Sequence, residues 1–318
     1  MAELTVSQKQ VINGIGEALQ KISFLKLPSY GHDDFNCDML LIVAPFRFGQ
    51  PVIDNIRKRV EDTKPKPQVI MLHMEDPQAI TPNERFVGWA DWIVSNDINA
   101  MDHYRQKLRD KNDLTRERQV LCWNSLGVSE TARAIIKEAT GDRPYDVIFL
   151  GYPYPTRARF VKDFVKAMPT TWRCLAVGDG WDQILAGFKK VETRKTLEEK
   201  ESIRLLCQSK VAVVTHRAGE DCGGFPSVKP GSVHRGFLEA ACGCAVVLDD
   251  TRTFGHGRVV LHQAKDALNA VKVTWNLLKK PETQKENQQV ALEDCSVLTR
   301  LTKVFNAVRS QNWSRWIP

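Results

Sequence analysis

Charged side chains with the spacing of a helix lie between residues 231 and 250, in the stretch GSVHRGFLEAACGCAVVLDD. The first half of this stretch predicts a helix, and the apolar run at 245–248 predicts a buried strand. His234 or Arg235 would then lie within one helical turn of Glu239. A cation at a helix start can hold a diphosphate, and a carboxylate one turn later can accept two hydrogen bonds from a ribose diol. A helix whose polar face simply meets water would show the same pattern.

The elements that must position these residues form a repeating series of strands and helices. Short apolar runs predict strands at 38–44, 69–74, 91–95 and 119–123, and again at 146–151, 172–178, 211–215 and 245–248. Helical stretches lie between them, so we expect an α/β protein with parallel sheets and helices on both faces. The turn-forming sequence TGDRP separates the two series.

We therefore expect two Rossmann-like domains whose parallel sheets face each other across a cleft. Residues 1–142 would form the first domain and residues 143–318 the second. A length of 318 residues fits two domains of ordinary size. The tail after Lys265 contains two helical stretches, and its C-terminal helix could pack back on the first domain.

The composition is that of a globular protein, with 42% hydrophobic and 26% charged residues. We find neither the apolar core of a signal peptide nor a membrane span, so we expect a cytoplasmic protein with no membrane partner. We also expect a monomer. The eight cysteines include no CxxC pair, which favours reduced thiols over disulfides or a zinc site. The net charge of +7 favours a polyanionic partner.

Polar residues follow most of the predicted strands, at the carboxyl ends where open parallel sheets bind ligands. The first three strands are followed by Arg47, Phe48, His73, Glu75, Asp76, Asn96 and Asp97. The second half places Gly151, Tyr152, Arg157, His216 and Arg217 in equivalent loops. Each of these could be ordinary loop chemistry, but together they outline a cleft between the two halves.

Three motifs carry a resemblance to a known family. They are GYPYPTR at 151–157, the turn HMEDP at 73–77 with SND at 95–97, and GFLEAACGCAVVLDD at 236–250. In order and spacing they resemble the CgeB-type glycosyltransferases of spore maturation. The second half is also similar to the DNA β-glucosyltransferases of T-even phages, and both are two-domain GT-B enzymes that take sugar from a nucleotide donor. The resemblance covers roughly residues 38–280.

The resemblance implies a role for each matching residue. Glu239 would bind the donor ribose, Arg157 would face the diphosphate and Gly151 would permit close backbone approach. The family arginine three residues before the glutamate is replaced by Gly236, and Arg235, one place earlier, would point about 100° away on a helix. His234 or Arg217 could then take the phosphate role. The donor-binding residues that we predict are Gly151, Tyr152, Arg157, His216, Arg217, His234, Arg235 and Glu239.

The expected activity is transfer of a sugar from a nucleotide-diphosphate sugar, with a UDP-sugar as the expected donor. By the resemblance Asp76 is the catalytic base, which an inverting reaction needs, although a turn or helix cap before Pro77 is the alternative. The sequence leaves inverting and retaining outcomes open. No DxD element precedes a donor loop, so we predict no metal and no further cofactor. The residues expected to face the acceptor are Arg47, Phe48, His73, Glu75, Asn96 and Asp97.

The expected acceptor is a 5-hydroxymethylpyrimidine in phage DNA, with double-stranded DNA as the partner. The net charge, the similarity of the second half and the basic side chains of the first half favour this acceptor. Phe46, Phe48 or Trp89 could stack on an exposed or flipped base. The alternatives are a polysaccharide or protein acceptor, and a non-catalytic nucleic-acid-binding protein on the same fold. The basic residues are Arg47, Arg57, Lys58, Arg59, Lys64, Lys66, Arg105, Lys107, Arg109, Lys111, Arg116 and Arg118.

Overall fold

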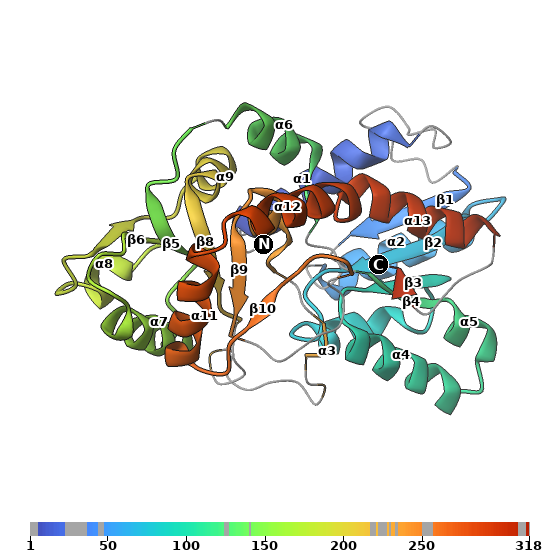
Figure 1. The fold of residues 1–318 in the computed structure, drawn as a ribbon. Coiled ribbons are helices and arrows are strands. Elements are labelled where there is room, and N and C mark those ends of the chain that lie inside the picture. The colour runs from blue at the N-terminus through green and yellow to red at the C-terminus, as the bar shows by residue number, and fades with distance from the viewer. Residues whose placement is uncertain are drawn as a thin grey trace.

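The computed structural model of the chain describes residues 6–22, 37–43, 48–123, 127–139, 141–216, 221, 228, 230–232, 235–249, 257–310 and 316–317. These residues form two α/β halves that lie side by side, each built on one sheet (Figure 1). The two parallel sheets confirm the α/β architecture that the alternation of apolar and helical stretches predicts.

The first sheet has the strand order β1-β2-β3-β4-β11, and its described pairs are parallel. Its strands are β1 (Met39–Val43), β2 (Gln68–His73), β3 (Trp92–Ser95), β4 (Val120–Trp123) and β11 (Trp316–Ile317). The helices of this half are α1 (Val6–Lys21), α2 (Gln50–Asp62), α3 (Ile80–Asn83), α4 (Ile98–Asp110), α5 (Leu114–Arg118) and α13 (Val297–Ser310), with the 3-10 helix η2 (Glu84–Phe86). One face of the sheet packs on α2, α3 and α4, and the other packs on α1 and α13.

The second sheet has the order β10-β9-β8-β5-β6-β7, and it is also parallel. Its strands are β5 (Tyr145–Leu150), β6 (Cys174–Val177), β7 (Val191–Arg194), β8 (Ser209–Val214), β9 (Ala245–Leu248) and β10 (His262–Gln263). The helices are α6 (Glu130–Glu138), α7 (Pro155–Ala167), α8 (Trp181–Ile184), α9 (Glu199–Cys207), α10 (Phe237–Ala241), α11 (Ala267–Leu278) and α12 (Glu282–Asp294). Both faces are covered, with α7, α8 and α11 on one side and α6, α9, α10 and α12 on the other.

The eight strands expected from apolar runs are all present. Most of their side chains are buried, as in Val120–Trp123, because helices cover both faces of each sheet. Strand β1 is the exception, since four of its five residues are only partly buried. Three further strands were not expected from the sequence. In β7 the residues Val191–Arg194 are partly exposed and mostly polar, and β10 and β11 are only two residues long.

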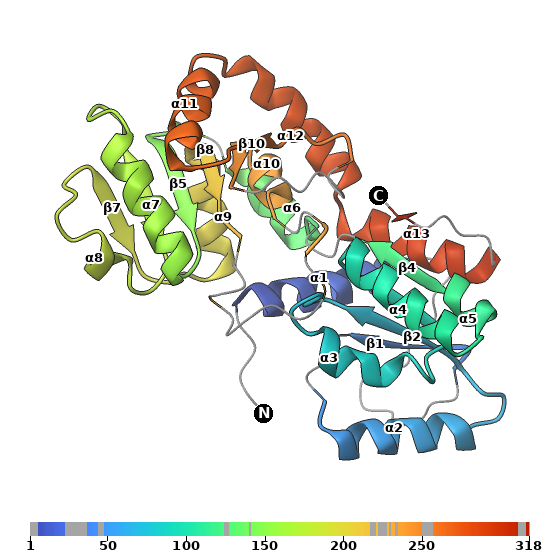
Figure 2. The same ribbon diagram turned by 90° about the horizontal axis from the view of Figure 1, so that it is seen from below.

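The chain crosses between the halves at two neighbouring places. The first crossing, at Val128, pairs with the second, at Ser296, as an isolated parallel bridge. The Val128 N–H donates to the Cys295 carbonyl at 2.7 Å, and the Val297 N–H donates to the Val128 carbonyl at 3.1 Å. Beyond the second crossing, α13 packs against α1 on the first sheet, as both views show (Figures 1 and 2).

The packing of α6 bears on the proposed division at residue 142. This helix precedes that position, yet Ala132, Ile135 and Ile136 lie in the core cluster of the second sheet. The core of the second half therefore begins near the first chain crossing, and residues 141–145 lie inside that half.

Two findings concern the described residues as a set. None of the helices that could be searched combines the length and the apolar character needed to cross a membrane. The cysteines within the described ranges are free thiols.

Candidate functional site

The second sheet has a point where the strand order reverses, between β5 and β8. The connections that leave these strands run to opposite sides of the sheet, and α/β proteins bind ligands in the crevice that this opens at the carboxyl ends. Gly151, Tyr152 and Arg157 follow β5, and Thr215 and His216 follow β8. The sheet therefore brings predicted donor residues from both loops to one edge.

Arg157 lies in the first turn of α7 and connects these two loops. Its Nε donates to Thr215 Oγ1 at 2.6 Å, its Nη2 donates to the Thr215 carbonyl at 2.7 Å, and its Nη1 donates to the Tyr152 carbonyl at 2.7 Å. Only 8% of the residue is exposed. Burial, and after it the charge of Arg235, lowers the pKa of Arg157 to about 10. Arg157 is therefore still a cation at neutral pH, although its surroundings disfavour the charged form.

Arg235 supplies a second guanidinium at this edge. Its Nη1 donates to the Leu150 carbonyl at 3.1 Å, and its Nη2 donates to Glu239 Oε1 at 3.0 Å. The side chain is 27% exposed, so it can meet both protein and solvent. The structure thus brings Arg235 close to both Arg157 and Glu239.

The local backbone differs from the helix expected over the start of this motif. The helix α10 begins at Phe237, and Gly236 is its N-cap with φ of 108°. This left-handed conformation, which glycine adopts readily, separates Arg235 from the helix. The expectation that Arg235 points about 100° away was wrong because it assumed a continuous helix. From outside the helix, Arg235 reaches Glu239.

Glu239 is buried, with 4% of the residue exposed. Its Oε1 accepts from Arg235, and its Oε2 accepts from the Gly236 N–H at 3.1 Å. The carboxylate thus caps α10 and fixes the guanidinium of Arg235. A ribose diol would have to use the remaining lone pairs of these two oxygens.

Gly151 lies between the two guanidinium groups. Its φ is 125°, and a Cβ at this position would lie 2.7 Å from Arg157 Nη1 and 3.5 Å from Arg235 Nη1. Trp181 Nε1 donates to the Gly151 carbonyl at 2.7 Å and fixes the turn. The absence of a side chain at residue 151 is therefore what allows two cations to converge on this backbone turn.

Carboxylates hold the loops around this centre. Asp249 accepts from the His216 N–H at 3.0 and 3.1 Å and contacts His216 Nδ1 at 3.1 Å. Asp221 accepts from the Thr156 N–H at 3.2 Å and also from the Thr156 hydroxyl. Tyr152 is 43% exposed at the same edge. The described edge is thus cationic at Gly151 and anionic at its flanks.

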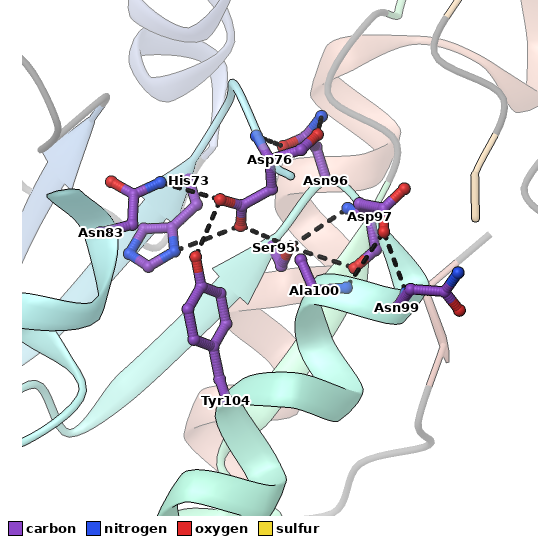
Figure 3. Close-up of polar contacts among 9 residues, drawn as sticks. All are labelled: His73, Asp76, Asn83, Ser95, Asn96, Asp97, Asn99, Ala100 and Tyr104. Atoms are coloured by element: carbon purple, nitrogen blue, oxygen red, sulfur yellow. Dashed lines mark hydrogen bonds and ion pairs between the residues drawn. The ribbon is translucent and has the colours of Figure 1, made fainter. Parts of the chain in front are cut away.

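The carboxyl edge of the first sheet is organised around Asp76 (Figure 3). Asp76 Oδ1 accepts from Asn83 Nδ2 at 2.9 Å and from the Tyr104 hydroxyl at 2.8 Å. Asp76 Oδ2 accepts from the Ser95 hydroxyl at 2.7 Å and lies 3.4 Å from His73 Nδ1. Asp76 has no exposed surface, so its carboxylate faces protein donors on all sides.

The charge state of Asp76 follows from these contacts. Burial would raise the pKa of its carboxyl group, but the charge of His73 and hydrogen bonds from Ser95 and Asn83 outweigh burial and lower it. The nearby anion, together with burial, raises the pKa of Tyr104 well above its ordinary value. The cluster is therefore an ionised carboxylate inside a shell of donors, which is typical of a structural carboxylate.

The other residues expected on the acceptor side differ from one another in burial. Asn96 Oδ1 accepts from the Asp76 N–H at 2.9 Å, and Asn96 is 3% exposed. His73 and Asp97 are fully buried, whereas Glu75 and Phe48 are partly exposed. Three predicted site residues, Arg47, Arg217 and His234, lie outside the described residues.

Sequence reasoning missed three residues that shape these edges. Thr215 anchors Arg157, and it carries the same signal as the others because it is polar and follows an apolar strand. Tyr104 and Asn83 bind Asp76 from helical segments 28 and 7 residues away, and no local pattern marks them.

Metal ligands were also sought among the described residues. In that part of the chain no group of three or more His, Cys, Asp or Glu side chains is arranged to hold a metal ion.

Comparisons with known proteins give no match in sequence and several in structure. No protein-family model matches the chain, and no curated protein matches it. An alpha-glucosyltransferase in complex with UDP and a 13-mer DNA containing a HMU base superposes with a TM-score of 0.58 and 13% identity, over 86% of this chain and 81% of that chain. HepE of Anabaena, in complex with UDP and glucose, gives a TM-score of 0.56 and 11% identity, over 85% and 78% of the two chains.

These similarities concern the fold, since the identities are low. Both halves are covered in each case, and the strand layout agrees with two Rossmann-like units. The expected resemblance to GT-B proteins is confirmed at that level. The chain has the GT-B fold of nucleotide-sugar glycosyltransferases.

Proposed function

We propose that the protein transfers a sugar from a nucleoside-diphosphate sugar, with a UDP-sugar as the donor, to a hydroxyl group. The observation that carries this proposal is the convergence of Arg157 and Arg235 on Gly151 at the point where the strand order reverses. Two guanidinium groups at the open edge of a sheet can bind a diphosphate and support the charge that it gains on leaving. The structural neighbours that contain UDP support the choice of nucleotide.

The two arginines would have different tasks. Arg235 is partly exposed and can turn hydrogen-bond donors toward a phosphate, while Arg157 is buried and orders the loops that carry the site. A bound diphosphate would also relieve the repulsion that contributes to the low pKa of Arg157. Glu239 would hold Arg235 and accept from the ribose. The guanidinium groups supply the positive charge in this proposal, and it invokes no divalent ion.

Isothermal titration with UDP tests the donor site. We expect wild-type protein to bind and Arg235→Ala to bind about 10- to 100-fold more weakly, because a charge-assisted contact is lost. Arg173→Ala is the matched control, since Arg173 is exposed and precedes β6 at the opposite edge of the same sheet. Absence of binding for every nucleoside diphosphate at millimolar concentration would reject the proposal.

For the acceptor we propose duplex DNA that contains a hydroxymethylated pyrimidine. The net charge of +7 supports it, as do exposed lysines in and after α2, Lys58, Lys64 and Lys66. The neighbour bound to DNA with a HMU base supports it further. The test is incubation with 5-hydroxymethylcytosine and 5-hydroxymethyluracil duplexes and a panel of nucleotide sugars, followed by digestion and mass spectrometry of the nucleosides. DNA affinity should fall by about one log unit per log unit of salt for each phosphate contact.

A polysaccharide or protein acceptor is the second candidate, and the ion pairs of the first half favour it. Arg57, Lys107, Arg109 and Arg116 pair with Glu61, Glu84, Glu117 and Asp113, respectively. Arg105 is buried, and its guanidinium donates to the Val120 carbonyl. These side chains offer less charge to DNA than the sequence suggests. If neither modified base gains a sugar and salt hardly changes duplex affinity, this second candidate replaces DNA.

A further inference from the structure

The two halves also touch at the carboxyl edge of the first sheet, where the residues that follow β3 meet the second half. Gly231 and Ser232 belong to the connection between β8 and α10 of the second half, yet they lie against the start of α4 in the first half. Val228, from the same connection, packs against the first-half core cluster that includes Ile42 and Met101. This contact joins the carboxyl edge of the first sheet to the segment that leads into the candidate donor site.

Asp97 is the centre of the contact. Its Oδ1 accepts from the N–H groups of Asn99 and Ala100, at 2.9 and 3.0 Å, and so caps α4 (Figure 3). Its Oδ2 accepts from the N–H groups of Gly231 and Ser232, at 2.8 and 3.0 Å. One fully buried carboxylate therefore serves both halves, with one oxygen for each.

Two further features make the contact tight. The Ser232 hydroxyl accepts from the Ile98 N–H at 2.9 Å, and Ser232 is fully buried. A Cβ on Gly231 would lie 2.6 Å from Asn99 Cγ and 2.7 Å from Ile98 Cγ2. The backbone of residue 231 thus fits against α4 only because it carries no side chain.

The contact is a short tether to the candidate donor site. Arg235 follows Ser232 by three residues, and three residues span at most about 11 Å. Arg235 is held in the second half by Leu150 and Glu239, while Ser232 is held in the first half by Asp97 and Ile98. The halves can therefore separate at this point only as far as residues 232–235 can extend, unless the hydrogen bonds at Ser232 or at Arg235 break.

We propose that Asp97 is a positioning residue for the transfer reaction, in that it fixes the first half at a set separation from Arg235 across the cleft. This inference rests on the proposed function, and it gives Asp97 a role other than acceptor binding. Because Arg235 has its own anchors in the second half, loss of the contact should leave donor binding intact. It should slow transfer, since a misplacement of about 1 Å can cost on the order of 100-fold in rate.

Asp97→Asn breaks only one side of the contact. Asparagine caps helices as well as aspartate does, so its oxygen can still serve α4. Its NH2 group would then face the N–H groups of Gly231 and Ser232, which are donors as well. Gly231→Ala breaks the same contact from the other side by steric overlap. Asp266→Asn is the control, because Asp266 caps α11 through Asn269 at 2.7 Å within the second half.

Hydrogen exchange, small-angle scattering and kinetics form the test. In Asp97→Asn and Gly231→Ala we expect the amides of residues 231 and 232 to exchange at least about tenfold faster, with an increased radius of gyration. In Asp97→Asn the amides of Asn99 and Ala100 should stay protected. The kcat of transfer should fall by about tenfold or more, while the Kd for UDP changes less than about threefold.

The outcomes separate this inference from the proposed function. Wild-type exchange at residues 231 and 232, or wild-type scattering and kcat in both variants, would overturn the positioning role even if the protein is an active transferase. A protein that binds no nucleoside diphosphate would overturn the proposed function, whereas exchange and scattering would still decide whether Asp97 sets the separation of the halves. A parallel loss in the Asp266→Asn control would assign the effect to general destabilisation and so contradict the inference.

Discussion

The carboxyl edges of the two sheets are built from the same kind of residues and have opposite characters. At the first edge Asp76 is buried, and its carboxylate is surrounded by Asn83, Ser95, Tyr104 and His73. At the second edge the buried cation Arg157 lies close enough to another cation for repulsion to help lower its pKa. The first edge surrounds its buried carboxylate with donors, whereas the second brings two cations together.

The topology of the sheets accounts for part of this difference. Described strands β1 to β4 follow one another in order across the first sheet, so their connections pack along one face, and Asn83 and Tyr104 of these connections reach Asp76. The second sheet reverses between β5 and β8, and Gly151 and Arg235 lie at this point, where α/β proteins commonly bind ligands. A polar side chain that follows a strand is thus a candidate ligand-binding residue where the strand order reverses. It is a structural residue where neighbouring loops supply its hydrogen-bond partners.

The largest test of this contrast is Asp76→Ala. It removes the acceptor from Asn83, Ser95 and Tyr104, and breaking such a buried charged network costs about 3–5 kcal/mol of unfolding free energy. Urea unfolding followed by circular dichroism measures the loss, and the exposed Asp110→Ala is the control. If Asp76 is also the catalytic base, Asp76→Asn should keep donor binding but lose about 100-fold in turnover.

Lowering the pH should reduce the contribution of Asp76 to the unfolding free energy. The pKa of Asp76 is lowered in the folded protein, so its stabilising contribution is complete above the unfolded value of about 3.9. This contribution is lost as the pH falls from there through the folded pKa, at no more than about 1.4 kcal/mol per pH unit for one proton. We expect the unfolding free energy of Asp76→Asn to depend less on pH in this range than that of the wild type. Parallel curves for the two proteins would contradict the lowered pKa.

A smaller loss of stability is expected from alanine at Gly151 of the second edge. Comparison with alanine at Gly141 separates the cost of backbone strain from the cost of displacing Arg157. Gly151 and Gly141 have φ of 125° and 137°, but only Gly151 has neighbours within reach of an added Cβ. Alanine at either position meets the backbone cost of a positive φ. Gly151→Ala should lose about 1 kcal/mol more than Gly141→Ala because it also displaces Arg157, and it alone should weaken UDP binding. Equal losses with unchanged UDP affinity would place the diphosphate elsewhere.

The sequence predicts most of the fold because burial leaves a readable pattern. A run such as 245–248 is apolar on both faces, and it forms a strand within a covered sheet. No such pattern marks β7, which is polar and half-exposed, or β11, whose two residues gain their partner only from β4. Contacts between distant segments decide these strands, and a local pattern contains no information about them.

The sequence could predict where the candidate site residues lie, but not which hydrogen-bond partners they have. Parallel strands bring their carboxyl ends together, so Asp76 and Arg157 could be assigned to edges from the sequence. Whether the hydrogen-bonding groups of each side chain already have partners within the protein depends on residues such as Tyr104 and Thr215, which come from other elements. Arg235 shows a further difficulty, because one glycine conformation moved it out of a helix that its spacing predicts.

The position of α13 has a consequence for how the chain is made. Leu301 and Phe305 of this helix cover the face of the first sheet that includes Leu72 and Trp92. They are translated only after the whole second sheet has left the ribosome, so during most of synthesis this apolar face lacks half of its cover. Contacts this distant in sequence form slowly and leave intermediates prone to aggregation. The half that begins the chain is therefore expected to finish folding last, and a fragment that stops at residue 142 should be insoluble.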